Sequence, residues 1–327
     1  MIISRTPLRM SFVGGGSDLP SFYRKFGGAV VSTAIDKFVY LTLNEKFDHR
    51  IRVSYSRTEE ADTVAEIQHP LVREAMTLLN CPGGLEITSI ADIPSKGSGL
   101  GSSSAFTVGL LHALHAYESR GTSAAQLAEE ACQIELERCG EPIGKQDQYA
   151  AAFGGFNFIE FHPDDSVSVE PMACKTETLA SLQENILVFY TGISRSASAI
   201  LKNQQEAVAS SAAKQQVLQR MVQLARDLKV ALQGNSTAGF GEMLHEGWEL
   251  KRSITSEISS GEIDAWYAAA RKAGASGGKL LGAGSGGFLM FYAPREKHEA
   301  IAAALKDLRQ IPTQFEAEGS KIIFVHD

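Results

Sequence analysis

The tract PSKGSGLGSSSAF, residues 94–106, constrains the fold more than any other part of this chain, because it joins a strand to a helix through a loop of small residues. The β-rich segment LEITSIADIP runs into it, and Phe106, Leu110 and Leu114 follow at helical spacing. Glycines let a backbone approach a phosphate closely, while the free amides and the dipole of a first helical turn stabilise an anion. The tract therefore predicts a phosphate site at a helix N-terminus.

Other interpretations of this tract are excluded or weaker. No GK[ST] follows the glycines, so the tract is not a Walker A loop. A plain flexible loop that ends on serine N-caps is the alternative when the tract is taken alone.

A second glycine-rich tract, ASGGKLLGAGSGGFLMFY, occupies residues 275–292. Gly282, Gly284 and Gly287 have the spacing of a dinucleotide-binding motif, but they lead into the apolar strand FLMFY and not into a helix. We therefore expect a tight turn between two strands that approaches a ligand or the other domain. A β-turn without any ligand is an equal alternative for this tract alone.

A third tract, TPLRMSFVGGGSDLPSFY, places Arg9 on a strand and Asp18 directly after three glycines. Such a loop exposes its backbone and leaves a carboxylate free to accept hydrogen bonds from hydroxyl groups. Taken by itself, the tract is equally typical of an ordinary glycine turn in which Asp18 is the N-cap of a helix.

The order of elements predicts two domains of the α+β class. The chain has 327 residues, enough for two domains of ~150 residues, and we place the boundary near residue 180. Segments IISRTPLRMSFV, GAVVSTAI, KFVYLTLNEK and RIRVSYS read as strands, and the short spacings between them suit antiparallel pairing. Helices follow at residues 69–80, 103–117 and 124–139. After residue 180, long helices at 197–234, 240–251, 262–273 and 295–309 alternate with the strands ILVFY, FLMFY and KIIFV.

Composition and charge exclude several classes of protein. Hydrophobic residues make up 44% and charged residues 21% of the chain, as in globular proteins, and the net charge of -7 disfavours nucleic acid and anionic membranes as partners. The start MIISRTPLRM lacks the apolar core of a signal peptide, so we expect a cytoplasmic protein with four cysteine thiols. The oligomeric state cannot be read from the sequence, and a homodimer stays open.

Together, the three tracts in this order resemble the GHMP small-molecule kinases, the superfamily of galactokinase, homoserine kinase and mevalonate kinase. The central motif of that superfamily, a proline followed by Gly-Leu-Gly-Ser-Ser-Ala, is matched by Pro94 and by GLGSS at residues 99–103, with Ser104 where an alanine is usual. The resemblance covers nearly the whole chain. It implies an N-terminal domain like ribosomal protein S5 domain 2, residues 1–180, and a ferredoxin-like C-terminal domain, residues 181–327.

The resemblance also implies roles for individual residues. Asp147 in GKQDQ aligns with the catalytic aspartate and Arg9 with the active-site arginine, whereas Ser103 and Glu135 match the ligands of Mg²⁺. Without the resemblance, Asp147 reads as an acid at a helix start and Glu135 as part of a solvated helix face. The residues expected to hold ATP are Pro94, Lys96, Gly97, Ser98, Gly99, Leu100, Gly101, Ser102, Ser103 and Ser104.

Within the superfamily, PLRMSFVGGGSDLPSFY and ERCGEPIGKQDQYAAAFGG look most like the sugar-1-kinase branch, the D-glycero-D-manno-heptose 7-phosphate kinases and, more distantly, the bacterial fucokinases. This implies a sugar phosphate substrate that is phosphorylated by ATP. The Glu-His pair of galactokinases is replaced by Gly15 and Gly16, so galactose is disfavoured. The expected substrate contacts are Gly15, Gly16, Ser17, Asp18, Arg195, Gly284 and Gly286.

The sequence leaves alternatives for the substrate-phosphate site, for a histidine pair and for the activity. Arg195, with Lys251 and Lys96, is available to bind a substrate phosphate, although charged surface residues are the usual interpretation. His112 and His115 lie three residues apart on an apolar helix without an evident third ligand, which favours a packed pair over a metal site. Among enzymes, a kinase of another sugar such as fucose, or of a non-sugar alcohol, is the alternative. A non-catalytic protein of the same fold that senses a sugar or nucleotide is the alternative to an enzyme.

Overall fold

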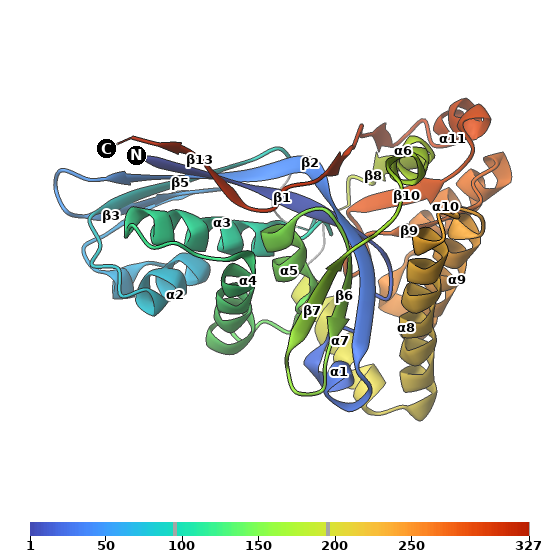
Figure 1. Cartoon of the computed structure of the whole chain (residues 1–327), viewed down its shortest axis with the longest axis horizontal. Coiled ribbons are helices and arrows are strands. Elements are labelled where there is room, and N and C mark those ends of the chain that lie inside the picture. The colour runs from blue at the N-terminus through green and yellow to red at the C-terminus, as the bar shows by residue number, and fades with distance from the viewer. Residues whose placement is uncertain (94–96, 194–196, 327) are drawn as a thin grey trace.

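A computed structural model gives the positions of residues 1–93, 97–193 and 197–326. The predictions that involve Pro94, Lys96 and Arg195 therefore lie outside the described residues. The first and last strands lie side by side (Figure 1), and the amino group of Met1 donates to the His326 carbonyl oxygen at 2.7 Å. None of the described helices is long and apolar enough to cross a membrane.

The larger sheet of the described residues has nine strands. Its main path runs β13–β1–β2–β5–β3–β4, while β12 and β6 also pair with β2, and β7 pairs with β6. The pairs are antiparallel, as the short spacings predict, except β3 with β5. The strands are β1 Ile2–Val13, β2 Gly28–Glu45, β3 Ile51–Ser54, β4 Thr58–Ala61, β5 Leu85–Ala91, β6 Phe156–Phe161, β7 Val167–Pro171, β12 Phe315–Glu316 and β13 Lys321–Val325.

One long strand replaces two strands that the sequence predicts. We expected a break near Asp36, but β2 continues through it from Gly28 to Glu45. Pro7 of β1 pairs with Phe38 while the next residue of β1 pairs with Ile35, so β2 bulges between them. A bulge absorbs extra residues and bends its strand, and proline has no N–H to give to the ladder at this point. Before the bulge β2 pairs with β6, and after it with β5.

Helices cover one face of this sheet (Figure 1). They are α2 Pro70–Leu78, α3 Ser102–Tyr117, α4 Ala124–Cys132 and α5 Gln146–Phe153. α3 packs closely on the sheet at Gly109, where an added methyl would lie 2.7 Å from Thr6 Oγ1. The predicted helix at 124–139 is α4 extended by a π-helical turn, η2 Gln133–Arg138, which carries Glu135. The helix start expected at Asp147 is the first turn of the short α5.

The second sheet has the ferredoxin-like order. Strands β8 Ile186–Tyr190, β9 Gly277–Leu280, β10 Phe288–Tyr292 and β11 Arg309–Gln310 pair antiparallel in the order β11–β8–β10–β9. Numbered along the chain, this is 4-1-3-2, the order of a βαββαβ unit. Its helices are α7 Ala197–Ala209, α8 Ala212–Gln233, α9 Phe240–Ile254, α10 Gly261–Ala273 and α11 His298–Ala304. The α+β prediction is therefore confirmed.

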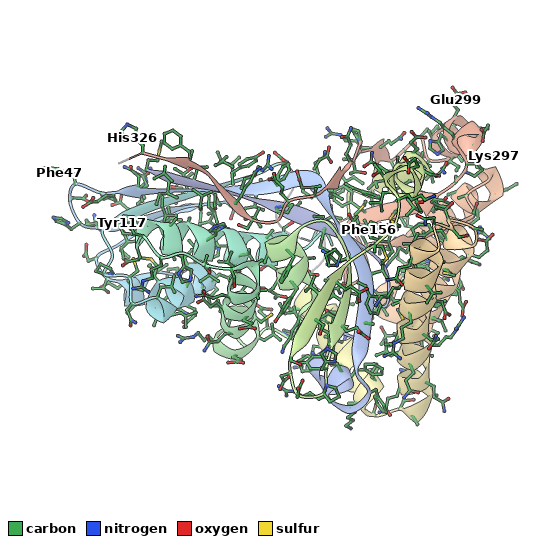
Figure 2. The ribbon with its side chains drawn as sticks, in the orientation of Figure 1. Phe47, Tyr117, Phe156, Lys297, Glu299 and His326 are labelled. Atoms are coloured by element: carbon green, nitrogen blue, oxygen red, sulfur yellow. The ribbon has the colours of Figure 1, made fainter. Side chains whose placement is uncertain are left out.

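The chain then returns to the first sheet, because β12 and β13 pair with β2 and β1. The segment after residue 180 thus contributes to both sheets, and the boundary itself stays a prediction; it falls within α6 Thr176–Glu184. Four phenylalanines join the halves. Phe156, labelled in Figure 2 between the sheet and α8, stacks on Phe12 with ring centroids 5.2 Å apart, and Phe240 and Phe315 pack edge-on against Phe12.

Candidate active site

A cavity of about 240 Å³ lies where the two halves of the chain meet. Its walls come from β1 and the glycine loop that follows it, from the starts of α3 and α5, and from α7, α9 and the turn after β9. The described residues that line it are Arg9, Gly16, Asp18, Leu19, Gly97, Ser98, Gly99, Gly101, Ser102, Ser103, Ser104, Glu141, Ile143, Gly144, Gln146, Asp147, Ser198, Leu201, Gln204, Lys251, Gly282 and Ala283.

The two glycine-rich tracts meet at one wall of this cavity. Gly99 and Gly101 have φ angles of 74° and 75°, and Gly101 is the N-cap of α3. An added methyl at Gly99 would lie 2.3 Å from the Leu281 carbonyl oxygen, and one at Gly282 would lie 2.3 Å from the Gly99 Cα. Only glycine permits both contacts. The turn after β9 therefore approaches the other half of the chain, as its sequence predicts.

Arg9 and Asp147 form an ion pair beside the start of α3. Arg9 Nε and Nη2 lie 2.7 Å and 2.6 Å from Asp147 Oδ1, and Nη1 donates to the Gly99 carbonyl oxygen at 2.7 Å. The arginine side chain is 4% exposed and the aspartate 26%. One guanidinium therefore fixes the position of a carboxylate relative to the glycine loop, because its planar fork spans both groups.

Glu135 is buried behind the serines of α3. Its carboxylate accepts hydrogen bonds from Ser103 Oγ at 2.9 Å, Ser104 Oγ at 2.7 Å and Thr107 Oγ1 at 3.2 Å, and also from Gln148 Nε2. Burial raises the pKa of Glu135, and these hydrogen bonds oppose the rise because they stabilise the charged form. Glu135 is thus not part of a solvated helix face.

Asp18 is also buried and is not a helix N-cap. Its Oδ1 accepts from the backbone N–H of Gly16 at 2.9 Å and its Oδ2 from that of Gln146 at 3.3 Å, whereas Leu19 takes the N-cap position of α1 Pro20–Phe26. Burial raises the pKa of Asp18, and the nearby Asp147 raises it further. The N-cap alternative for Asp18 is therefore wrong, and its carboxylate lines the cavity.

Two lysines of the second half reach the site. Lys251 of α9 lines the cavity and donates to the Gly282 carbonyl oxygen, and burial, with Arg9 nearby, lowers its pKa to about 8. Lys279 of β9 donates to the carbonyl oxygens of Ser11 and Phe12 at 2.8 Å and 3.0 Å, and burial lowers its pKa well below the usual range. Lys279 thus joins the two halves, whereas Lys251 presents a cation to the cavity.

Several expected contact residues lie outside the cavity wall. Among the described residues, Gly15, Ser17, Leu100, Gly284 and Gly286 do not line it. Ser17 Oγ bonds the Ala29 backbone, and added methyls at Gly284 and Gly286 would meet the carbonyl oxygens of Ile258 and Ile193 at 2.8 Å and 2.5 Å. Their roles in binding stay predictions.

The histidine pair has protein partners. His115 Nε2 lies 2.7 Å from Glu130 Oε2, and His112 Nδ1 lies 3.0 Å from Ser320 Oγ. Burial lowers the pKa of His112. Within the described ranges, no group of three His, Cys, Asp or Glu is arranged to hold a metal ion.

Sequence reasoning missed four polar residues of the cavity, Glu141, Gln146, Ser198 and Gln204. Gln146 adjoins Asp147 in GKQDQ, and this position was the available signal. Gln204 lies on α7, where a glutamine among polar neighbours reads as a solvated helix face. α7 lies beside α1 (Figure 1), a contact between distant segments that no local pattern indicates.

Comparison with known proteins identifies the family. The model of the GHMP kinases N terminal domain matches residues 64–155, and the model of the GHMP kinases C terminal domain matches residues 228–309. The D-glycero-alpha-D-manno-heptose 7-phosphate kinase of Campylobacter jejuni is 30% identical over an alignment of length 340 that covers 98% of each chain.

Solved structures agree with this. A D-glycero-D-manno-heptose 1-phosphate kinase from Bacteroides thetaiotaomicron is 27% identical with a TM-score of 0.82, and both chains are covered completely. A putative sugar kinase from Campylobacter jejuni is 28% identical with a TM-score of 0.78, covering 98% of this chain and 97% of the other.

The chain belongs to the GHMP kinase family. It is an ATP-dependent phosphotransferase of this family and, on its similarity to the heptose kinases, a sugar kinase.

Proposed function

We propose that this kinase transfers the γ-phosphoryl group of ATP to the anomeric hydroxyl of D-glycero-D-manno-heptose 7-phosphate, giving the 1,7-bisphosphate. The Campylobacter relative that carries this substrate in its name supports the assignment. The observation that carries it is the Arg9–Asp147 pair at the start of α3, where an acceptor hydroxyl and a phosphate would meet. The product would feed nucleotide-activated heptose for surface polysaccharide, in the cytoplasm where ATP is available.

Asp147 would act on the acceptor hydroxyl. Both Arg9 contacts end on Oδ1, and Oδ2 has no hydrogen-bond partner among the described residues. Oδ2 would accept the proton of the anomeric hydroxyl, or orient that hydroxyl, as its oxygen attacks the γ-phosphorus. A positioned general base contributes roughly 10²- to 10⁴-fold in rate. Arg9 would hold the carboxylate in place and stabilise the negative charge that develops.

The start of α3 would hold the triphosphate. The N–H groups of its first turn have no partners within the helix, and Ser102, Ser103 and Ser104 line the cavity there. These donors and the helix dipole favour the β- and γ-phosphates. Phosphoryl transfer needs positioning and charge neutralisation more than covalent help, so this loop supplies most of what the reaction requires.

Ser103 and Glu135 fit a magnesium ion. Their oxygens lie 2.9 Å apart, close to the ~3 Å that separates neighbouring ligands of an octahedral ion with ~2.1 Å bonds. Mg²⁺ takes one or two protein oxygens and completes its shell with phosphates and water. When bound, it would neutralise charge on the β- and γ-phosphate oxygens. Gln148 and Ser104 would keep the Glu135 carboxylate oriented.

Lys251 would bind oxygens of the transferred phosphoryl group. Arg9 and Lys251 carry the positive charges of the described cavity wall, and Arg9 is already engaged by Asp147 and Gly99. Lys251 donates to one carbonyl oxygen, that of Gly282, which leaves N–H groups for an anion. The 7-phosphate of the sugar lies at the far end of the substrate and would need another cation. Arg195 stays the sequence-based candidate for that role, outside the described residues.

The experiment is an ADP-release panel with heptose 7-phosphate, heptose 1-phosphate, mannose, fucose, galactose and mevalonate, in which phosphorus NMR locates the new phosphate. We expect the fastest turnover on heptose 7-phosphate, with the new signal at C1. The Asp147→Asn enzyme controls for contaminating kinases. Turnover of fucose or another sugar, without turnover of the heptose phosphate, would mean that the assigned substrate is wrong. An absence of ADP release with every acceptor of the panel would favour the non-catalytic sensor of sugar or nucleotide.

A further inference from the structure

Gln204 is a polar residue turned fully inward on α7. Its side chain is 0% exposed and lines the cavity, while its neighbours Lys202 and Asn203 are exposed. Among the residues that the structure describes, neither Nε2 nor Oε1 has a hydrogen-bond partner. A flipped amide, with nitrogen and oxygen exchanged, would be unpaired as well, because neither atom has a partner.

Such a group calls for an explanation. A buried amide that makes no hydrogen bond destabilises the folded state, and folded proteins hold few of them. An apolar side chain of the same length would pack at this position without that cost. A ligand that enters the cavity would satisfy both atoms of the amide, which is the role such groups have in binding sites.

A second unpaired amide oxygen lies on the same cavity. Gln146, the first residue of α5, has a buried Oε1 without a partner, although its backbone N–H holds Asp18. The two glutamines flank the glycine loop: an added methyl at Gly16 would lie 2.5 Å from Gln204 Nε2, and one at Gly15 would lie 3.8 Å from Gln146 Nε2. Side chains at these two glycines would fill the space that the amides border.

The chemistry of this group points to neutral hydroxyls. A carboxamide donates through its NH₂ and accepts through its oxygen, which suits a hydroxyl that does both. A phosphate at this position would need a cation, and of the two in the described wall, Arg9 is engaged by Asp147 and Gly99, while Lys251 is assigned to the transferred phosphoryl group. Gln146 lies beside Asp18, the residue expected to contact the sugar, because its backbone N–H donates to the Asp18 carboxylate.

We propose that Gln204, assisted by Gln146, binds hydroxyl groups of the sugar ring and so determines which sugar is phosphorylated. This inference rests on the proposed function, because it needs a polyhydroxyl acceptor. It adds a residue of α7, in the second half of the chain, to the expected substrate contacts Asp18 and Gly16 of the first half.

The first test compares Gln204→Met with Gln205→Met. Gln205 is the adjacent residue of the same type on α7 and does not line the cavity. We expect Gln204→Met to raise the KM for heptose 7-phosphate at least tenfold with the KM for ATP within twofold, and Gln205→Met to change neither. The melting temperature of Gln204→Met without ligand should not fall, because an unpaired polar group is removed. An unchanged sugar KM in a folded variant would overturn the proposal.

Monodeoxy analogues of the heptose phosphate give a sharper readout. The wild-type enzyme should lose at least tenfold in kcat/KM on the analogue that lacks the hydroxyl bound by Gln204, because the amide is then left unpaired. In Gln204→Met this loss should shrink to less than about threefold, while the losses for the other analogues stay. If Gln204→Met does not fold, Gln204→Glu takes its place in both tests, because glutamate has the same shape and keeps an acceptor oxygen.

The outcomes separate the two proposals. Identical losses for every analogue in the wild type and the variant would overturn the role of Gln204 and leave the sugar kinase in place. A wild-type enzyme that turns over no sugar phosphate, but does turn over an alcohol such as mevalonate, would overturn both.

Discussion

Arg9 and Asp147 meet through a single carboxylate oxygen. Nε and Nη2 of Arg9 both lie within 2.7 Å of Oδ1, while Oδ2 lies beside Gly101, where an added methyl would be 3.4 Å from it. One oxygen of the aspartate is therefore fixed, and the other is turned to the helix start that would hold the phosphates. This division of the two oxygens is the basis of the first two predictions.

Asp147→Asn should lower kcat at least about a hundredfold and leave ATP binding nearly unchanged, because the carboxylate acts on the hydroxyl during transfer. Steady-state kinetics and ATP titration check this. Asp307→Asn, an exposed aspartate far along the chain, is the matched control. Near-normal turnover of purified Asp147→Asn would remove the residue from the catalytic role.

Arg9→Lys should lower kcat about tenfold or more although the charge is kept, because an ammonium group cannot bond Asp147 and the Gly99 carbonyl oxygen together in a planar fork. The magnesium dependence should not move. Full activity of the lysine variant would mean that charge alone is needed at this position.

Glu135→Gln and Ser103→Ala should each raise the Mg²⁺ concentration that gives half-maximal rate, because a hard cation loses an oxygen ligand. The measurement is a magnesium titration at saturating ATP. Glu137→Gln, an exposed glutamate on the same helical turn, should behave as the wild type. Ser103→Ala guards against the chance that the amide of Glu135→Gln disturbs the donors around it, and unchanged titrations for both would exclude the metal site.

The pH profile should report Lys251. Its pKa of about 8 means that the free enzyme loses this charge as pH rises through 8, so kcat/KM should fall there. Stability should change in the opposite sense: the native state releases the proton near pH 8 and the unfolded state only near ~10.4, so the free energy of unfolding gains from this group as pH rises between them. If the enzyme lost activity because it unfolded, the free energy of unfolding would instead fall over the same pH range as kcat/KM. Lys251→Arg should move the fall in kcat/KM to higher pH, and an identical profile would exclude Lys251.

Gly99→Ala should destabilise the protein more than Gly192→Ala. The two glycines have similar φ angles, 74° and 72°, so both substitutions carry the cost of a left-handed backbone. An added methyl at Gly99 meets the Leu281 carbonyl oxygen at 2.3 Å, whereas nothing lies within 4 Å of one at Gly192. The difference between their melting temperatures therefore measures the contact of the two glycine tracts. Equal melting temperatures would contradict that contact.

Local patterns in the chain were sufficient for much of the fold. The strand β1, the loop and helix start at Gly101 and Ser102, and the strand β10 all lie where alternation, glycines and helical spacing predict them. These patterns depend only on residues that are neighbours in sequence, so they can be recognised without knowledge of the tertiary structure. The resemblance that they support led to the family, which the comparisons confirm.

The bounds of several elements could not be predicted in the same way. β9 has four residues, two of them glycine, and is a strand because β10 pairs with it. The predicted helix at 295–309 is only the seven-residue α11, since the chain must turn to place β11 beside β8. β2 runs on through Asp36 because β1 supports it on both sides of the bulge. In each case, the bounds of the element depend on a strand partner that is distant in sequence.

In the active site, too, the sequence names residues but does not give their arrangement. Arg9, Ser103 and Asp147 were named from motifs, but their distances depend on three segments that fold against one another. The burial of Glu135, the lowered pKa of Lys251 and the inward turn of Gln204 follow from the packing of η2, α9 and α7 around one cavity. Residue types and spacings specify local conformation and the chemistry available, whereas burial and electrostatics arise from all surrounding atoms, and only the folded chain brings those atoms together.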